Sequence, residues 1–372
     1  MPLEQALGLT LSEDVVSPID TPSFPQSSMD GYAFAHESLS RHGSLTVVGT
    51  LAAGTDMAMR LKDGEAARIF TGAPLPEGAD TVAMQEKCTR MGDLLGFDET
   101  PQKGANVRLP GTEAARGAVA LTAGNTLTAA AIGFLSGLGL TEAKVYPTPS
   151  VSILVTGDEL QEPGLPLRFG QVYESNSRSL TAALQTMGVG RIRKARCPDD
   201  PETLRHTLEK ALDDSDIVLL TGGVSVGDYD YVPLAAEACG VDKVFHRVRQ
   251  KPGKPLFFGV KEGKAVFGLP GNPASVLTCF HEYVTIAVDA MSARRQTLRS
   301  SHATLKNTVR KPAGLTHFLK ARHEDGTVTV LEGQESYKLK TFAMADCLVV
   351  LDEETTVCEA GTSVEIHHLT EQ

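Results

Sequence analysis

One glycine-rich stretch of the chain carries the residues with the clearest chemical meaning. Thr221–Asp230 (TGGVSVGDYD) directly follows the apolar run Ile217–Leu220, so a strand is predicted to end in a glycine-rich turn. Turns of this kind often bind phosphate. Asp228 and Asp230 would repel a phosphate unless a divalent cation lay between them, and carboxylate oxygens are the ligands that Mg²⁺ prefers. The stretch therefore predicts a phosphate site that uses Mg²⁺.

A second stretch could supply positive charge to such a site. Residues 251–255 (KPGKP), called the lysine loop below, place Lys251 and Lys254 on either side of a Pro-Gly turn. Two converging ammonium groups suit a tetrahedral oxyanion or a phosphate. A solvated surface loop is the alternative, but the prolines make the backbone rigid on both sides and favour a functional role.

Two further strand ends are predicted to meet the first at one edge of a sheet. Val151–Val155 runs into TGDE (156–159), and the hairpin-like segment that ends at Phe267 runs into GLPGNP (268–273), which opens a helix. Any one of these exits could be a tight turn chosen for its backbone geometry. Ligands bind at the carboxyl edge of open α/β sheets, so three unusual exits together favour a binding site.

Four carboxylates near these exits are candidate metal ligands. Asp158 follows the first strand, Glu174 lies in VYESN (172–176), and Asp228 and Asp230 follow the glycine turn. Asp230 is equally well explained as the cap of the helix that follows it. Asp228 lies inside the turn and is the better candidate.

The elements that must position these residues alternate between strand and helix through the middle of the chain. Such alternation predicts a parallel sheet with helices on both faces. The region before residue 145 is β-prone and predicts one or two irregular β or α+β modules. The region after about residue 300 is also β-prone and predicts a small β domain of four to six strands. The predicted strands are Val151–Val155, Gly190–Arg196, Ile217–Leu220, Leu256–Val260 and Ala265–Phe267, and the helices are Ser179–Met187, Pro201–Leu212, Val232–Ala238 and Ala274–Ala290.

Composition excludes several other classes of protein. The net charge of −11 argues against a general nucleic-acid binder, although a local basic cluster could still bind a small anion. No apolar run approaches the roughly 18 residues of a membrane span, and the N-terminus lacks the pattern of a signal peptide, so a cytoplasmic location is expected. The six cysteines form no CxxC pair, which argues against a zinc site or a disulfide framework.

The motif GVSVG around Ser225 resembles the nucleophile turn of a hydrolase. Ser225 does not directly follow its strand, so a hydrolase serine is not expected there.

Seven motifs, in one order along nearly the whole chain, resemble the molybdopterin molybdenumtransferase family. These molybdenum-cofactor insertases include the C-terminal domain of gephyrin. By themselves the first two motifs indicate only constrained loops. The motifs are SSMDGYA (27–33), RIFTGAPLPEGAD (68–80), TGDEL (156–160), QVYESN (171–176), TGGVSVGDYDYV (221–232), KPGKP (251–255) and GLPGNP (268–273).

The resemblance implies a multidomain α/β plus β fold and an elongated homodimer whose active site is shared between subunits. The central domain would be a three-layer α/β/α sheet domain of the molybdopterin-binding type. The implied domains are a split, N-terminally short linker domain (1–27 and 125–146), an inserted β-rich domain (28–124), the α/β domain (147–295) and a C-terminal small β domain (296–372).

The implied reaction takes adenylylated molybdopterin and molybdate, with Mg²⁺, and gives molybdenum cofactor and AMP. Partners would be the adenylyltransferase upstream and molybdoenzyme acceptors downstream, with no nucleic acid and no membrane. The resemblance also implies four sets of site residues. The catalytic residues would be Asp228 and Glu174, with Asp30 and Thr71 from the partner subunit, and the metal ligands would be Asp228, Glu174 and Asp230. The substrate would be bound by Thr156, Gly157, Asp158, Thr221, Gly222, Gly223, Ser225, Pro270, Asn272 and Pro273, and the oxyanion by Lys251, Lys254, Ser275, Arg322 and Ser336.

Other functions compete with this prediction. The chain could be an adenylyltransferase that makes the adenylylated pterin from ATP, but the extra domains and the lysine loop favour the insertase. It could be a non-catalytic scaffold like part of gephyrin, but the carboxylates and lysines of the site are present. It could also serve another nucleotide-linked step, since a fold does not fix a function. The family usually has an aspartate where this chain has Glu113, which puts the contribution of that loop in question.

Overall fold

The computed structural model describes residues 1–55, 58–224, 231–295 and 299–369. The chain divides into two compact units, residues 1–7 with 11–145, and residues 8–10 with 146–372. No helix within the described ranges is long and apolar enough to cross a membrane.

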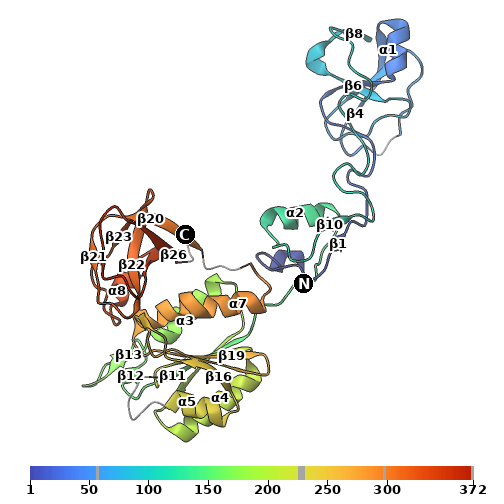
Figure 1. The fold of residues 1–372 in the computed structure, drawn as a ribbon. Coiled ribbons are helices and arrows are strands. Elements are labelled where there is room, and N and C mark those ends of the chain that lie inside the picture. Colours follow the sequence, from blue (N-terminus) through green and yellow to red (C-terminus); the bar gives the residue numbers. More distant parts are fainter. Residues whose placement is uncertain (56–57, 225–230, 296–298, 370–372) are drawn as a thin grey trace. The chain divides into compact units, whose positions relative to one another are not determined.

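The first unit contains a six-stranded sheet in the order β6-β3-β5-β4-β8-β7 (Figure 1). Alternate residues of β3 pack on opposite faces, with Phe34 in one core cluster and Ala33 in another. The helix α1 contacts β4. The elements are β3 (Gly31–Phe34), α1 (His36–His42), β4 (Leu45–Leu51), β5 (Glu65–Ile69), β6 (Thr81–Met84), β7 (Cys88–Met91) and β8 (Leu94–Phe97).

Both ends of this unit's sequence share a second core. The helix α2 (Ala129–Gly137) begins at Thr128, whose hydroxyl accepts a hydrogen bond from the Ala131 N–H. Its buried residue Leu135 packs with Leu3 of the N-terminal turn η1. The other elements are η1 (Leu3–Gln5), the pair β1 (Val15–Val16) and β10 (Val119–Leu121), and the pair β2 (Gln26–Ser27) and β9 (Val107–Arg108).

The second unit is built around a six-stranded sheet in the order β14-β11-β15-β19-β18-β16. Helices cover both of its faces (Figure 1), α3 with α6 and α7 on one and α4 with α5 on the other. This confirms the predicted three-layer α/β/α arrangement. The strands are β11 (Val151–Thr156), β14 (Ile192–Cys197), β15 (Ile217–Thr221), β16 (Asp242–His246), β18 (Phe257–Lys261) and β19 (Lys264–Leu269), and the helices are α3 (Asn176–Thr186), α4 (Pro201–Asp214), α5 (Tyr231–Ala238), α6 (Pro273–Cys279) and α7 (Thr285–Met291).

Two details of the predicted sheet domain are wrong. The sheet is not parallel throughout, because β18 and β19 form a tight hairpin and β16 pairs antiparallel with β18. Glu262 and Gly263 make the hairpin turn, both with positive φ. The segment Ala274–Ala290 is not one α-helix, since the π-helical turn η3 (Phe280–Val284) separates α6 from α7.

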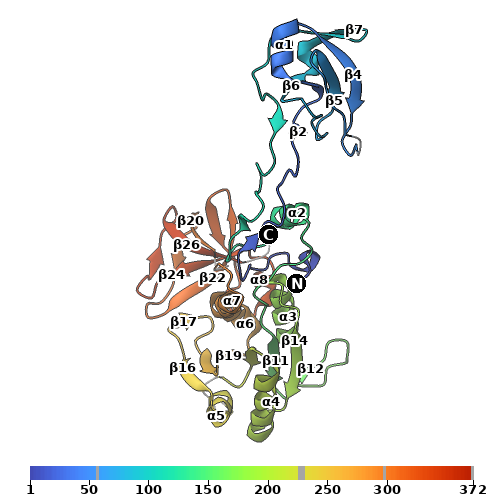
Figure 2. The same ribbon diagram turned by 90° about the vertical axis from the view of Figure 1, so that its right-hand side faces the viewer.

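The C-terminal strands form a ladder that closes on itself (Figure 2), because β22 pairs with both β23 and β24. A short strand of the lysine-loop region, β17 (Gln250–Lys251), pairs in parallel with the start of β22. The lysine loop is therefore attached to the C-terminal barrel. The barrel strands are β20 (Ser300–Leu305), β22 (Thr316–Glu324), β23 (Thr327–Val330), β24 (Cys347–Leu351) and β26 (Ser363–His368), with β21 (Val309–Arg310) paired to β25 (Val357–Cys358) and a short helix α8 (Leu339–Phe342).

Candidate active site

The carboxyl ends of the parallel strands β11, β15 and β19 open into a cavity of about 650 Å³. All three predicted strand exits line it, as expected for ligand sites of open α/β sheets. Asp158 is exposed beside it and Thr221 is buried beneath it. The predicted substrate-binding residues in its wall are Thr156, Gly157, Gly222, Gly223, Pro270, Asn272 and Pro273.

Gly222 shows why the glycine turn has its sequence. Its φ is +88°, and a Cβ there would lie 2.7 Å from Thr156 Oγ1 and 2.9 Å from Thr156 O. Only glycine combines this backbone conformation with so close an approach. Gly222 is therefore required by the geometry of the turn and also contributes to the binding site, because the close packing of the turns after β11 and β15 shapes the floor of the cavity.

Asn176, at the start of α3, presents an unused acceptor at the cavity. Its Nδ2 donates to Gly271 O at 2.8 Å, which fixes the amide. The residue is 9% exposed, and within the described ranges its Oδ1 has no hydrogen-bond partner. Buried polar atoms are nearly always paired, so this oxygen is suited to accept from a ligand in the cavity.

Glu174 lines the same cavity but already performs a structural role. Its Oε1 accepts from the Ser177 N–H at 2.7 Å and its Oε2 accepts from Ser177 Oγ at 2.7 Å. The carboxylate, 7% exposed, thereby satisfies a free N–H in the first turn of α3. Glu174 precedes α3 by two residues and Ser177 lies in its first turn, and the sequence analysis did not anticipate this cap.

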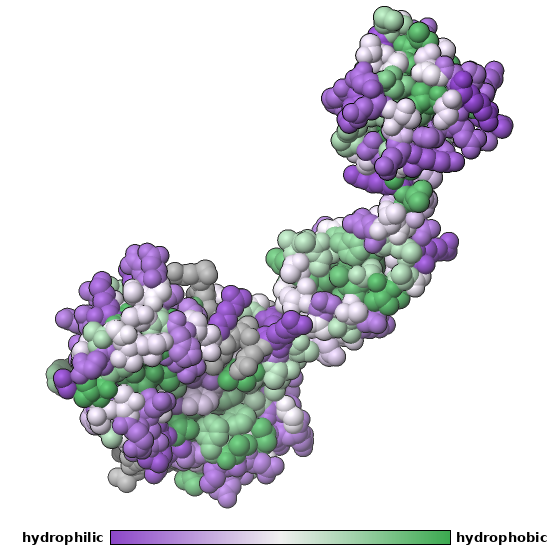
Figure 3. Space-filling view, turned by 45° about the horizontal axis from the view of Figure 1, so that its top comes forward, coloured by the Kyte–Doolittle hydropathy of each residue, from purple (hydrophilic) through white to green (hydrophobic). Residues whose placement is uncertain are grey.

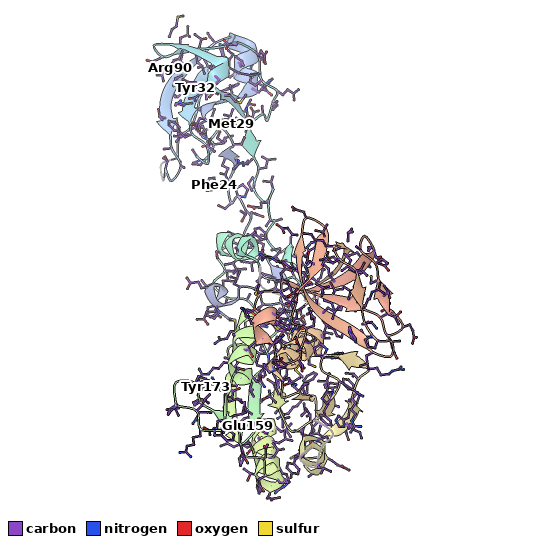
Figure 4. All side chains as sticks on the ribbon, turned by 90° about the vertical axis from the view of Figure 1, so that its left-hand side faces the viewer. Phe24, Met29, Tyr32, Arg90, Glu159 and Tyr173 are labelled. Atoms are coloured by element: carbon purple, nitrogen blue, oxygen red, sulfur yellow. The ribbon has the colours of Figure 1, made fainter. Side chains whose placement is uncertain are left out.

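The described residues do not form a complete Mg²⁺ site. None of their His, Cys, Asp and Glu side chains gather in a group of three or more that could hold a metal ion. Glu159, Glu174 and Asp199 offer oxygen donors at the cavity wall, and Figure 4 shows Glu159 beside Tyr173. The predicted residues Ser225, Asp228 and Asp230 lie outside the described residues.

The lysine loop is held from below by buried side chains. Gln250, 3% exposed, donates to Pro252 O at 3.0 Å and accepts from the Tyr283 hydroxyl. A Cβ at Gly253, whose φ is +91°, would lie 2.5 Å from Cys279 Sγ. Gln250, Tyr283 and Cys279 thus fix the loop's shape, and the sequence analysis found none of them because their contacts span about thirty residues.

The two loop lysines themselves are exposed, and the loop that carries them contributes to two cavities. Pro255 lines the large cavity, whereas Lys251 and Pro252 line a second one of about 510 Å³ against the barrel. His317 of β22 also lines this second cavity, and burial together with the charges of Lys311 and Lys251 lowers its pKa. The second cavity therefore has a positive wall.

The other predicted oxyanion-binding residues lie in different places. Ser275 is buried on α6, under the lysine loop, and its carbonyl would be 3.8 Å from a Cβ at Gly253. Ser336 reaches the large cavity's edge, where its Oγ accepts from Asn272 Nδ2 at 3.0 Å. Arg322 is exposed on β22 and lines neither cavity.

The predicted catalytic pair of the first unit is formed across its sheet. Asp30 Oδ1 accepts from the Thr71 N–H at 2.8 Å and from Thr71 Oγ1 at 2.8 Å. These two bonds hold the pKa of the Asp30 carboxyl below its usual value, and Arg68 adds to the effect. The Arg68 guanidinium lies 4.7 Å from the ring centre of Phe70 and 5.3 Å from that of Tyr32, and Tyr32 is labelled in Figure 4 with Met29.

A multidomain α/β protein with a ligand cavity at the carboxyl edge of its central sheet is the class that the fold and site define. Three family models match the chain. The MoeA N-terminal region (domain I and II) matches residues 1–139, a probable molybdopterin binding domain matches 152–290, and the MoeA C-terminal region (domain IV) matches 302–369.

Individual proteins give the same result. The chain is 34% identical to the molybdopterin molybdenumtransferase of Haemophilus influenzae over 98% of this chain and 92% of that protein. It is 33% identical to molybdopterin molybdenumtransferase 2 of Mycobacterium tuberculosis over 100% and 95%. The crystal structure of the molybdopterin biosynthesis MoeA protein of Pyrococcus horikoshii is similar with a TM-score of 0.83 and 29% identity, covering 99% of this chain and 94% of that one. The chain belongs to the molybdopterin molybdenumtransferase family, and it is a transferase.

Proposed function

We propose that this transferase inserts molybdate into adenylylated molybdopterin, with Mg²⁺-dependent release of AMP, to give molybdenum cofactor. The observation that carries the proposal is the cavity of about 650 Å³ at the sheet edge, lined by all three glycine- or proline-rich exits. Its size suits a drug-sized ligand such as a pterin nucleotide. Membership of the family suggests the reaction, and the cavity offers a site in which the adenylylated pterin could bind.

In this proposal the described residues bind and orient the substrate. The backbone at Gly222 and Gly223 admits it to the cavity floor, and Asn176 Oδ1 accepts a hydrogen bond from it. Lys251 and Lys254 hold the oxyanion, with Ser336 at the cavity edge as the next candidate. Ser275, which is buried, and Arg322, which lines neither cavity, could take part only after a rearrangement. Holding two reactants together in a shaped site lowers the entropic part of the barrier. Asp228, Asp230 and Glu174 are the proposed metal ligands, and Asp228→Asn is expected to abolish turnover.

We further propose that the protein works as a cytoplasmic homodimer in which Asp30 and Thr71 serve the partner subunit's cavity. Support comes from the first unit, where Asp30 and Thr71 form an accessible polar pair and neither residue lines the large cavity of the second unit. Figure 3 also shows apolar and weakly polar residues on the surface of the segment that holds α2, where Ile132 and Phe134 are partly exposed. Light scattering of the purified protein tests the dimer. Equal activity in an Asp30→Asn and Asp228→Asn mixture and in either variant alone would oppose the shared site.

The decisive experiment follows AMP release from adenylylated molybdopterin by purified protein. The proposal expects release that requires both molybdate and Mg²⁺ and that stops with a chelator. Molybdate-independent release, or none, would overturn it. A parallel reaction with molybdopterin and ATP tests the adenylyltransferase alternative, which predicts pyrophosphate release. Binding of the adenylylated pterin without turnover in either reaction would favour a scaffold.

A further inference from the structure

A buried lysine of the barrel is bonded to the loop that reaches the large cavity. Lys320 lies on β22, and the residue is only 2% exposed. Its ammonium donates to three backbone carbonyls, Gly333 O at 2.9 Å, Glu335 O at 3.2 Å and Lys338 O at 3.3 Å. An ammonium has three N–H donors, so each has an acceptor here. Residues 333–338 are called the Ser336 loop below.

The main chain of the same residue holds the loop as well. The Lys320 N–H donates to Gln334 Oε1 at 2.9 Å, and Gln334 Nε2 donates back to Lys320 O at 2.8 Å. Gln334 Nε2 also donates to Leu331 O at 2.8 Å. The Ser336 loop is thus attached to one residue of β22 through both its side chain and its backbone.

The far side of the Ser336 loop reaches the substrate cavity. Ser336 O accepts from the Ala274 N–H at 3.0 Å, which satisfies a free donor at the start of α6. Ser336 Oγ accepts from Asn272 Nδ2 at 3.0 Å. Tyr337, 62% exposed, lines the cavity together with Asn272. Lys320 is therefore connected to the cavity wall by hydrogen bonds through one short loop.

Burial of an ammonium is costly, and packing alone does not explain it here. A methionine would have a similar length without a charge to desolvate, and such replacements of buried charges are often neutral or stabilising. Burial accordingly lowers the pKa of Lys320. Unlike a methionine side chain, the ammonium binds three carbonyl oxygens of the Ser336 loop at once and so holds them close to one point.

We infer that Lys320 is a positioning residue for the substrate cavity. Its ammonium holds the Ser336 loop in the conformation in which Ser336 bonds to the turn before α6 and Tyr337 forms part of the cavity wall. Lys320 itself does not touch the substrate. The effect on substrate binding rests on the proposed function, whereas the effect on the Ser336 loop does not.

Hydrogen exchange at the Ala274 amide tests the loop directly, without any substrate. In Lys320→Met we expect the Ala274 N–H to lose at least about tenfold in protection, since its acceptor Ser336 O is no longer held. The matched control is Lys261→Met. Lys261 Nζ also donates to the protein backbone, at Cys239 O (2.7 Å), but Cys239 does not line the cavity. Unchanged protection of Ala274 in a folded Lys320→Met protein would overturn the inference.

Kinetics then test the consequence for the cavity. We expect Lys320→Met to raise KM for adenylylated molybdopterin by about tenfold, with a much smaller change in kcat, because binding is impaired more than chemistry. Adding Ser336→Ala to Lys320→Met should change KM by less than Ser336→Ala does alone, since the two act through one loop. Additive effects, or an unchanged KM, would contradict the inference.

Two further outcomes, an inactive wild-type protein and a variant that does not fold, are distinguished from the results above. If wild type releases no AMP from the pterin, the proposed function fails, and the Ala274 exchange still decides the role of Lys320. If Lys320→Met does not fold, Lys320→Gln keeps two N–H donors and takes its place in both measurements. Unfolding of both variants where Lys261→Met stays folded would show that Lys320 supports the barrel as a whole, and would overturn its assignment to the cavity.

Discussion

Two carboxylates, one in each unit, bind a hydroxyl residue with the same pair of hydrogen bonds but in different surroundings. Asp30 is half-buried and accepts from the N–H and Oγ1 of Thr71 through one oxygen, Oδ1. Glu174 is 7% exposed and accepts from the N–H and Oγ of Ser177 through both of its oxygens. The first pair joins residues 41 apart in the chain, and the second joins residues three apart.

The difference separates a carboxylate that uses one oxygen for its neighbour, Asp30, from one that uses both oxygens to build the fold, Glu174. Thr71 engages only one oxygen of Asp30, which leaves the other side of the carboxylate for an outside group. Both oxygens of Glu174 are used to start α3, the helix that carries Asn176 into the cavity. A family role assigned to both residues from sequence motifs alone does not make this distinction, whereas stability and activity measurements can.

The largest expected effect is on stability, from Glu174→Ala. The change leaves the buried Ser177 N–H and hydroxyl without their acceptors, so the free energy of unfolding should fall by about 2–3 kcal/mol. Urea denaturation measures it. Glu159→Ala is the matched control, since Glu159 is an exposed acid in the same cavity wall and should cost about 0.5 kcal/mol or less. A Glu174→Ala protein that is inactive but as stable as wild type would make Glu174 a ligand-binding residue rather than a cap.

The next effect is on activity, from Asp30→Asn. The asparagine Oδ1 can still accept both Thr71 bonds, so stability should change by about 0.5 kcal/mol or less. Loss of the charge should lower kcat/KM for AMP release by at least about tenfold, or 1.4 kcal/mol. Asp93→Asn, at an exposed acid of the same unit, should leave both quantities unchanged. A stability loss in Asp30→Asn as large as that in Glu174→Ala would remove the contrast between the two sites.

A smaller effect is expected from Thr71→Val. This variant removes one of the two bonds to Asp30 but keeps the backbone N–H. Because the lost bond is exposed and water can replace it, a loss of about two- to fourfold in kcat/KM is expected. Thr71→Ser keeps the hydroxyl and should retain wild-type activity. A loss of activity in Thr71→Ser with wild-type activity in Thr71→Val would mean that the methyl group, not the bond to Asp30, matters.

The parts of this molecule that the sequence predicts are those that depend on residues close to one another in the chain. The strands β11 and β15 are short apolar runs that end in glycine turns, and the rule that ligands bind where such strands end placed the cavity. The amphipathic helix α4 follows from Leu204, Leu208, Ala211 and Leu212, with Asp200 as its cap. The edge strand β16 was not predicted at all, because its residues Asp242–His246 are largely exposed and carry no buried apolar run.

The supports of the site could not be predicted, because they depend on contacts between distant segments. Gln250, Tyr283 and Cys279 meet only after α6 has packed under the lysine loop. Lys320 shows a weak local signal, a single charge in an apolar run of β22, but its acceptors are 13 to 18 residues further on. Sequence patterns located the turns that line the cavity, whereas the side chains that support those turns are defined by packing.

The smallest expected effect is a change in pH dependence, and it tests the hydrogen bonds that Asp30 accepts from Thr71. The bonds from Thr71 hold the pKa of Asp30 below its usual value, so the active carboxylate form persists to more acidic pH than it would otherwise. Removing the Thr71 hydroxyl in Thr71→Val takes away one of these bonds, and the pKa of Asp30 should rise towards its usual value. The acid limb of the kcat/KM profile should therefore move to higher pH in Thr71→Val and stay in place in Thr71→Ser. A shift to lower pH, or none, would show that ionisation of Asp30 does not control the reaction.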